Sequence, residues 1–333
     1  MSERLDRALG ALYGLAVGDA LGMPTQTLSR RRVAALFGEL DGFRDGPGEN
    51  EVSAGLVAGH VTDDTDQALI VARLLVEGAG RVDPDTFVAR LLAWQERMVD
   101  AGSADLLGPS TLRALRLVTD GGQPGATGRW GDTNGAAMRV APLGVAVPAS
   151  PVDRLCDAVA DLDRVTHDTT IANAGACAVA AVVSAGVDGA TYAEALPTAL
   201  RAAELGGRRG HHVGGADVGR RIGWALDLTR GAGPDGLLDL VDGLVGTSVA
   251  TQESVPAAFA VAGAAPDDPW QAALLAARLG GDSDTIAAMA GAMVGACTGL
   301  SALPAAAVET VRRVNDLHLE PLATALLELR GRA

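Results

Sequence analysis

The sequence predicts an all-α protein, a single compact globule built from many helices. Apolar residues recur at helical spacing in one segment after another, and Gly- or Pro-rich stretches separate these segments. No run of alternating β-branched residues predicts a strand. The 333 residues show neither an internal repeat nor a linker, so we expect residues 1–333 to form one domain.

The first half of the chain contains six predicted helices. The first of them ends at Gly22-Met23-Pro24, a combination that stops a helix. Asp83 and Pro84 supply the N-cap and the first residue of the third. Gly-rich stretches at residues 41–59 and 121–135 predict long loops. The six helices are expected at residues 5–21, 64–77, 84–99, 110–119, 136–147 and 152–162.

The second half continues the same pattern from residue 169, with a Gly/Arg loop at residues 206–215 between its second and third helices. Its most apolar stretch, residues 286–308, carries Gly291, Gly295 and Gly299 at four-residue spacing, which also occurs on dimerising membrane helices. Hydroxyl residues and a proline interrupt this stretch and acidic residues flank it, so we interpret it as a buried helix packed through small residues. The helices of this half are expected at residues 169–185, 192–204, 218–228, 236–244, 255–262, 269–279, 284–298, 305–317 and 321–329.

Composition and charge restrict the partners and the compartment. The net charge of −14 argues against a nucleic acid or an anionic membrane as partner, since both select clustered cations, and it suits binding of metal cations. The three cysteines are not paired at metal-binding spacing, and an odd number fits a reducing compartment. The N-terminus has mixed charge without the shape of a signal peptide. We expect a cytoplasmic protein, either a monomer or a small homo-oligomer.

Two predicted helix starts concentrate carboxylates and hydroxyls. They are Thr62-Asp63-Asp64-Thr65 and Gly280-Gly281-Asp282-Ser283-Asp284-Thr285. Asp and Thr are also ordinary helix caps, but each start carries more of these groups than capping requires. If the two starts converge, their oxygens favour Mg²⁺, Mn²⁺ or Ca²⁺ over zinc, because neither His nor Cys contributes. The candidate metal ligands are Thr62, Asp63, Asp64, Asp282, Asp284 and Thr285.

Three further stretches carry candidate site residues. In residues 131–139 a loop runs into a helix, where backbone amides and Asn134 are available to a sugar or phosphate; helix capping is the alternative role of Asn134. His167 stands at another helix start, where a structural role is the alternative to a catalytic one. Asp105 precedes a further helix, and capping or solvation is its alternative.

These motifs occur in the order that the ADP-ribosylglycohydrolases show, and the chain resembles that family over about residues 5–300. The motifs that carry the resemblance are residues 14–22, 62–65, 134–139, 166–167, 252–258 and 280–285. The resemblance implies an all-α fold with two divalent metal ions, Mg²⁺ or Mn²⁺. It implies hydrolysis of the glycosidic bond at the anomeric carbon of the ribose in an ADP-ribosylated protein or a small ribosylated molecule.

The resemblance also assigns roles to individual residues. It places Asn134, Gly135, Ala136 and His167 in the substrate pocket, and Asp105 as a group that moves protons, together with the metal-binding Asp64 or Asp284. Many members have a Glu near the metals shortly after the first motif, where this chain has Gln26, which we count among the predicted substrate-binding residues. Because Gln carries no charge and is no base, hydrolysis of a smaller N-ribosyl compound, such as a nucleoside, is the alternative function. A non-catalytic ADP-ribose-binding protein and a helical scaffold are the alternatives from other classes.

Overall fold

The computed structural model describes residues 1–103 and 107–332. Within those ranges the chain forms helices and two isolated bridges, Thr133–Ala250 and Thr169–His211, but no strand. The predicted all-α fold is therefore confirmed. In chain order the α-helices are α1 (Glu3–Gly22), α2 (Arg30–Phe37), α3 (Asp63–Glu77), α4 (Pro84–Asp100), α5 (Pro109–Thr119), α6 (Gly135–Met138), α7 (Ala141–Ala146), α8 (Val152–Asp163), α9 (Thr170–Val187), α10 (Tyr192–Gly206), α11 (Val218–Thr229), α12 (Pro234–Leu240), α13 (Thr251–Ala264), α14 (Pro269–Ala277), α15 (Ser283–Thr298), α16 (Ala305–Asn315) and α17 (Glu320–Arg332).

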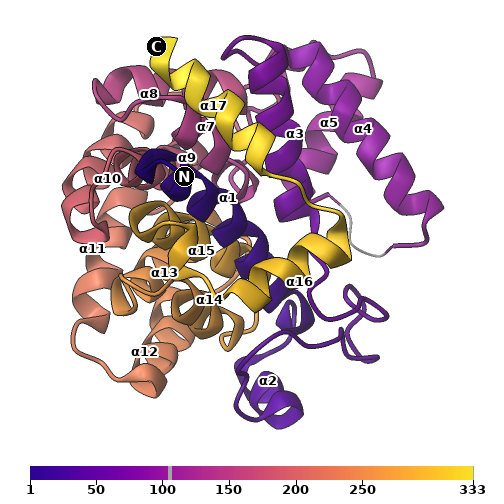
Figure 1. Cartoon of the computed structure of the whole chain (residues 1–333). Coiled ribbons are helices and arrows are strands. Elements are labelled where there is room, and N and C mark those ends of the chain that lie inside the picture. The colour runs from indigo at the N-terminus through magenta and orange to yellow at the C-terminus, as the bar shows by residue number, and fades with distance from the viewer. Residues whose placement is uncertain (104–106, 333) are drawn as a thin grey trace.

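Helices α1 and α15 run antiparallel through the centre of the protein with their backbones in contact (Figure 1). A Cβ atom on Gly14 of α1 would lie 2.2 Å from the carbonyl oxygen of Gly291, and one on Gly18 would lie 2.1 Å from that of Ala287. Only glycine permits such an approach, so the four-residue glycine spacing is a packing device. The prediction that α15 is a buried helix packed through small residues is confirmed.

The same contact positions the acidic start of α15. Gly22, the last residue of α1, lies so close to α15 that a Cβ atom there would be 2.4 Å from the Cα of Asp284. The hydroxyl of Ser283 donates a hydrogen bond to the Gly22 carbonyl oxygen at 3.1 Å. The end of α1 and the first turn of α15 therefore form one rigid unit.

Helix α9 is the other central element, and it packs against α7, α8, α10 and α15. By length and composition α9 is apolar enough to cross a membrane, but 89% of it is buried inside the protein, as in a core helix. In Figure 1, α10, α11 and α12 lie on one side of this centre, and α3, α4 and α5 lie on the other. Helix α17 contacts α1, α3 and α7.

The structure changes two predicted helices and adds one that was not predicted. The helix expected at residues 136–147 is two helices, α6 and α7, because Pro142 has no backbone N–H with which to continue the first one. The helix expected at residues 236–244 ends at Leu240 and continues as a π turn, Val241–Val245. Helix α2 was not predicted, because it begins with three consecutive arginines and shows little apolar periodicity. Val33 is its one buried residue.

Candidate metal centre and substrate cavity

The start of α3 is held in place by Asp19, a buried carboxylate on α1. It accepts hydrogen bonds from the backbone N–H groups of Thr62, at 3.0 Å, and Thr65, at 3.1 Å, and from both hydroxyls. Burial raises the pKa of Asp19 to about 6, although these hydrogen bonds lower it. Sequence analysis gave Asp19 no role. The available signal was a single carboxylate in the apolar stretch of α1 at residues 8–22.

The two acidic helix starts meet at Asp64 and Asp284. The hydroxyl of Thr285 on α15 donates a hydrogen bond to Oδ2 of Asp64 on α3 at 3.1 Å. Only 1% of Asp64 and 4% of Asp284 is exposed, and Oδ1 of each has no hydrogen-bond partner in the described part of the chain. Burial raises the pKa of both carboxyls well above the usual range, and neighbouring carboxylates raise them further.

These residues fit a hard divalent cation. Two buried carboxylate oxygens without a donor are costly unless positive charge compensates them. No group of three or more His, Cys, Asp or Glu side chains in the described ranges forms a ready set of ligands. Hydroxyl oxygens would therefore have to take part, as expected for Mg²⁺ or Mn²⁺. The six predicted ligands Thr62, Asp63, Asp64, Asp282, Asp284 and Thr285 all belong to the two converging helix starts.

Asn134 links the start of α6 to Asp282. Its side-chain amide donates hydrogen bonds to Oδ2 of Asp282 and, at 2.9 Å, to the hydroxyl of Ser254 on α13. Neither Asn134 nor Asp282 makes a side-chain capping hydrogen bond to the helix that it precedes. Burial raises the pKa of Asp282 to about 6, while hydrogen bonds from Asn134 and Thr285 lower it. Both side chains therefore make a tertiary contact, and neither caps the helix that follows it.

A fully buried cation, Arg139, lies behind the carboxylates. Its guanidinium donates to Oε1 of Gln67 at 2.8 Å, and the Gln67 amide donates to Asp63 at 2.6 Å. The guanidinium also lies 4.9 Å from the centre of the Phe87 ring. Burial lowers the pKa of Arg139 to about 10, and Asp163 opposes this shift, so the group remains charged at neutral pH. Sequence analysis quoted Arg139 in a motif but gave it no role.

His167 supports the cavity wall from behind. Its ring has no exposed surface and is hydrogen-bonded to the hydroxyls of Thr133, at 3.1 Å, and Thr166, at 2.8 Å. A Cβ atom on Gly135 would lie 2.8 Å from Cε1 of His167, so the ring presses on that glycine. Burial, and then the charge of Arg139, lowers the pKa of His167 well below its usual value. The side chain is therefore neutral at physiological pH.

A cavity of about 210 Å³ opens over the acidic helix starts. Three predicted substrate-binding residues, Gln26, Asn134 and Gly135, line it, whereas Ala136 and His167 are fully buried and lie outside the lining. Gln26 is 7% exposed, and its side-chain Nε2 has no hydrogen-bond partner in the described ranges. The predicted ligands that line the cavity are Asp63, Asp282, Asp284 and Thr285, with Thr62 and Asp64 beneath. Asp105 lies outside the described residues.

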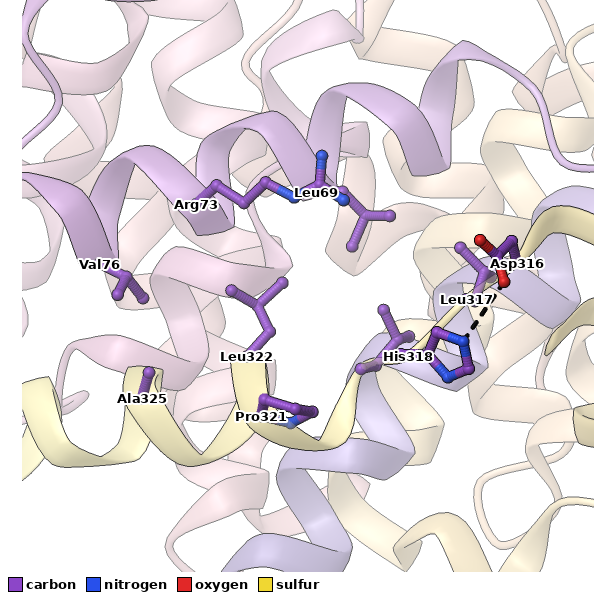
Figure 2. Close-up of a pocket in the computed structure, with 10 residues that line it drawn as sticks. Leu69, Arg73, Val76, Asp316, Leu317, His318, Pro321, Leu322 and Ala325 are labelled. Carbon is purple, nitrogen blue, oxygen red and sulfur yellow. Dashed lines mark ion pairs between the residues drawn. The ribbon is translucent and has the colours of Figure 1, made fainter.

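A different hollow, between α3 and α17, does not resemble a reaction site. Figure 2 shows its walls, with Leu69, Arg73 and Val76 on α3 and Leu322 on α17. Its one acidic group, Asp316, is exposed and paired with His318 at 3.3 Å. The ionisable groups of this hollow are Arg73 and one exposed ion pair, whereas the acidic cavity is lined by buried and half-buried carboxylates, so the acidic cavity is the candidate site.

The chain is similar in sequence to proteins that are named as hydrolases of ADP-ribosyl groups. The model of the ADP-ribosylglycohydrolase family matches residues 1–333. The chain is 39% identical to the uncharacterized protein YegU of Escherichia coli K12, with 98% of each chain covered. It is 30% identical to ADP-ribosylarginine hydrolase Tri1 of Pseudomonas putida, covering 98% of this chain and 79% of that one.

Two further comparisons agree with these. ADP-ribosyl-[dinitrogen reductase] glycohydrolase of Rhodospirillum rubrum is 32% identical over 51% of this chain and 54% of its own. A solved structure described as an ADP-ribosylglycohydrolase-related protein complex matches with a TM-score of 0.70 and 28% identity, and 99% of each chain is covered. Similarity thus extends over the whole chain in both sequence and fold.

Proposed function

The chain belongs to the ADP-ribosylglycohydrolase family of glycosidases, and on that premise we propose that it is a metal-dependent hydrolase of an ADP-ribosylated substrate. The bond cleaved joins the anomeric carbon of the ribose to the group that carries the ADP-ribose. One observation carries the proposal. Two buried carboxylates from distant helix starts, Asp64 and Asp284, each keep an oxygen that has no hydrogen-bond partner among the described residues, next to the cavity.

The six ligands named above would hold two divalent cations, Mg²⁺ or Mn²⁺. When bound, such cations supply positive charge that orients sugar hydroxyls and makes water a better nucleophile. The chain itself supplies the frame for them. Asp19 fixes the first turn of α3 through four donors, and the glycine contact of α1 fixes the first turn of α15. Buried Arg139 offsets part of the negative charge from behind.

The bond change follows the general course of glycoside hydrolysis. A water oxygen forms the new bond to the anomeric carbon, the bond to the leaving atom breaks, and the leaving atom gains a proton. Positive charge develops on the sugar ring in the transition state, and carboxylates at the cavity floor stabilise it. Asp105, or one of the pair Asp64 and Asp284, takes the proton from the attacking water and passes it to the leaving atom in this proposal.

The cavity wall would orient the sugar. Asn134 holds Asp282 in one direction, and neutral His167 supports Gly135, whose backbone faces the cavity. Gln26 lines this space, and its Nε2 has no hydrogen-bond partner in the described ranges, so it is suited to donate a hydrogen bond to a sugar hydroxyl or carbonyl group.

Two observations favour hydrolysis of a smaller N-ribosyl compound as the second candidate function. The cavity of about 210 Å³ is smaller than most sites for drug-sized ligands, which measure roughly 300–1,000 Å³. The amide of Gln26 is neutral where the family resemblance implies a carboxylate, so the local charge differs from that expectation. A nucleoside would place its ribose in the cavity and its base at the rim.

A release assay distinguishes these candidates. The protein is incubated with ADP-ribosylated arginine, with an ADP-ribosylated protein and with nucleosides, each in EDTA, Mg²⁺ or Mn²⁺. We expect release of free ADP-ribose from the first two substrates, and only with metal. Release from nucleosides alone would assign the second function. Release in EDTA at the full rate would refute metal dependence, and binding of ADP-ribose without any release would identify a non-catalytic binding protein.

A further inference from the structure

A larger hollow lies at the opposite end of α3 from the acidic cavity. It has a volume of about 610 Å³, and residues of the α3–α4 turn, α7, α8 and α17 line it. Its floor is apolar, with Leu75, Leu143 and Leu162. We call it the basic groove, because four arginines line it: Arg81, Arg154, Arg164 and Arg332.

The charge of the basic groove is opposite to that of the whole chain. Its lining contains the four arginines and a single acidic residue, Asp161, in a protein whose net charge is −14. The side chain of Arg81 has no ion pair or hydrogen bond in the described ranges. A concave surface with clustered cations attracts anions and raises their local concentration.

The ion pairs of Arg164 and Arg332 leave these two side chains available. Arg164 lies 3.5 Å from Asp161, and Arg332 lies 3.9 Å from Glu328. More than half of every side chain in these pairs is exposed, and exposed pairs at such distances contribute little stability. Both arginines therefore reorient toward a bound anion at low cost.

A hollow of similar size elsewhere provides a contrast. It has a volume of about 620 Å³ and contains Arg30, Arg31 and Arg278, but also two aspartates in its lining. Arg30 is paired with Asp239, and Arg278 is paired with Asp235 at 3.1 Å. Size and arginine content alone do not make an anion site, and the excess of positive charge distinguishes the basic groove.

We propose that the basic groove binds an organic phosphate, a small molecule with at least one phosphate group and an apolar or planar body, such as a nucleoside diphosphate. The guanidinium groups present paired N–H donors that match phosphate oxygens. The apolar floor covers the organic part, and the volume lies within the usual range for small ligands. With a rise of 1.5 Å per residue, α3 separates this site from the acidic cavity by about 20 Å.

Isothermal titration calorimetry with ADP and with inorganic pyrophosphate tests this assignment on the full chain. The variants are Arg81→Ala/Arg332→Ala and the charge reversal Arg81→Glu. Arg31→Ala removes an exposed arginine from the contrasting hollow and serves as the matched control. Asp284→Ala reports any ADP that binds at the acidic cavity instead. All three arginines are exposed, so these variants are expected to fold.

The expected result is ADP binding that weakens at least about tenfold in the double variant and in Arg81→Glu, and remains unchanged in Arg31→Ala and Asp284→Ala. The affinity should also fall with added salt. Absence of ADP binding, or equal affinity in wild type and double variant, overturns the proposal. Loss in Asp284→Ala alone assigns the binding to the acidic cavity and likewise overturns it. If pyrophosphate binds as tightly as ADP, the organic part of the ligand contributes nothing to binding, and the assignment to an organic phosphate is wrong.

Discussion

The contact between α1 and α15 makes a quantitative prediction for Gly14→Ala. The added Cβ would lie 2.2 Å from the carbonyl oxygen of Gly291 and 2.8 Å from its carbonyl carbon. Real contacts of a Cβ atom do not fall below 3.0 Å, so the helices must separate by about 0.8 Å. Both opposing atoms belong to helix backbone, and no side chain can rotate away to relieve the contact.

The free energy of unfolding should fall by about 2 kcal/mol. Overpacking a core costs roughly 1–3 kcal/mol, and the upper end applies here because backbone meets backbone. Replacing Gly by Ala within a helix returns about 1 kcal/mol. Gly223 of α11 is the matched control, since a Cβ atom there meets nothing within 4 Å. Gly223→Ala should leave stability unchanged or raise it by up to about 1 kcal/mol.

The assay is urea unfolding followed by far-ultraviolet circular dichroism, with both variants and wild type measured together. Activity adds a second measurement. Separation of α1 and α15 moves Asp284 relative to Asp64, and a misplacement of about 1 Å can cost on the order of 10²-fold in rate. Gly14→Ala that is as stable and as active as Gly223→Ala would refute the argument that glycine contacts position the acidic helix starts.

Five further predictions concern the acidic site. Asp284→Ala should abolish most turnover and leave the circular dichroism spectrum unchanged; near-wild-type turnover would contradict a role in the metal centre. Mn²⁺ added after EDTA should raise the melting temperature, because a cation that binds only the folded state stabilises it; an unchanged midpoint at saturating Mn²⁺ argues against the site. In EDTA the free energy of unfolding should decrease as the pH rises from about 4 to about 6. Asp19 and Asp282 have pKa values of about 6 in the folded state, against 3.8 for an unperturbed carboxyl. Between these values the folded state keeps protons that the unfolded chain has released, so stability falls as the pH rises. Urea titrations at pH 4, 5 and 6 measure this decrease. Asp105→Asn should lower kcat about 10²-fold, and full rate in this variant would remove Asp105 from the mechanism. Gln26→Glu should alter Mn²⁺ affinity or the range of ribosylated substrates. Unchanged Mn²⁺ affinity and unchanged kcat/KM across those substrates would remove Gln26 from the mechanism.

Local sequence signals were accurate wherever a residue acts on its own helix. Asp83 caps α4 through a hydrogen bond from the backbone N–H of Thr86, with Pro84 in the first position, as predicted. The positions of α3 and α15 were predicted to within a residue or two at each end, because their starts carry polar groups and their bodies are apolar. By contrast, α2 was missed, since its start is a run of charge and its buried face is one residue wide.

Residues that act across the fold were not assigned from sequence. Nothing local distinguishes Arg139 from a surface arginine, because its partners Gln67 and Thr166 lie 72 and 27 residues away. His167 was placed in the substrate pocket by resemblance, whereas the structure places it behind Gly135. The arginines of the basic groove come from three separate parts of the chain, with Arg154 and Arg164 ten residues apart and Arg81 and Arg332 distant from both, and they share no sequence pattern.

The sequence by itself determined the chemistry of the candidate site. Carboxylates and hydroxyls at two helix starts, with neither His nor Cys among them, define an oxygen donor set, and glycines at every fourth residue define a face that another helix can approach. Only the tertiary structure decided that Thr285 reaches Asp64 across 221 residues of chain, and which donors surround Asp19. The physical reason is one of range. Capping and periodicity act within a turn or two of helix, whereas the meeting of α3 and α15 depends on how α1 packs against both.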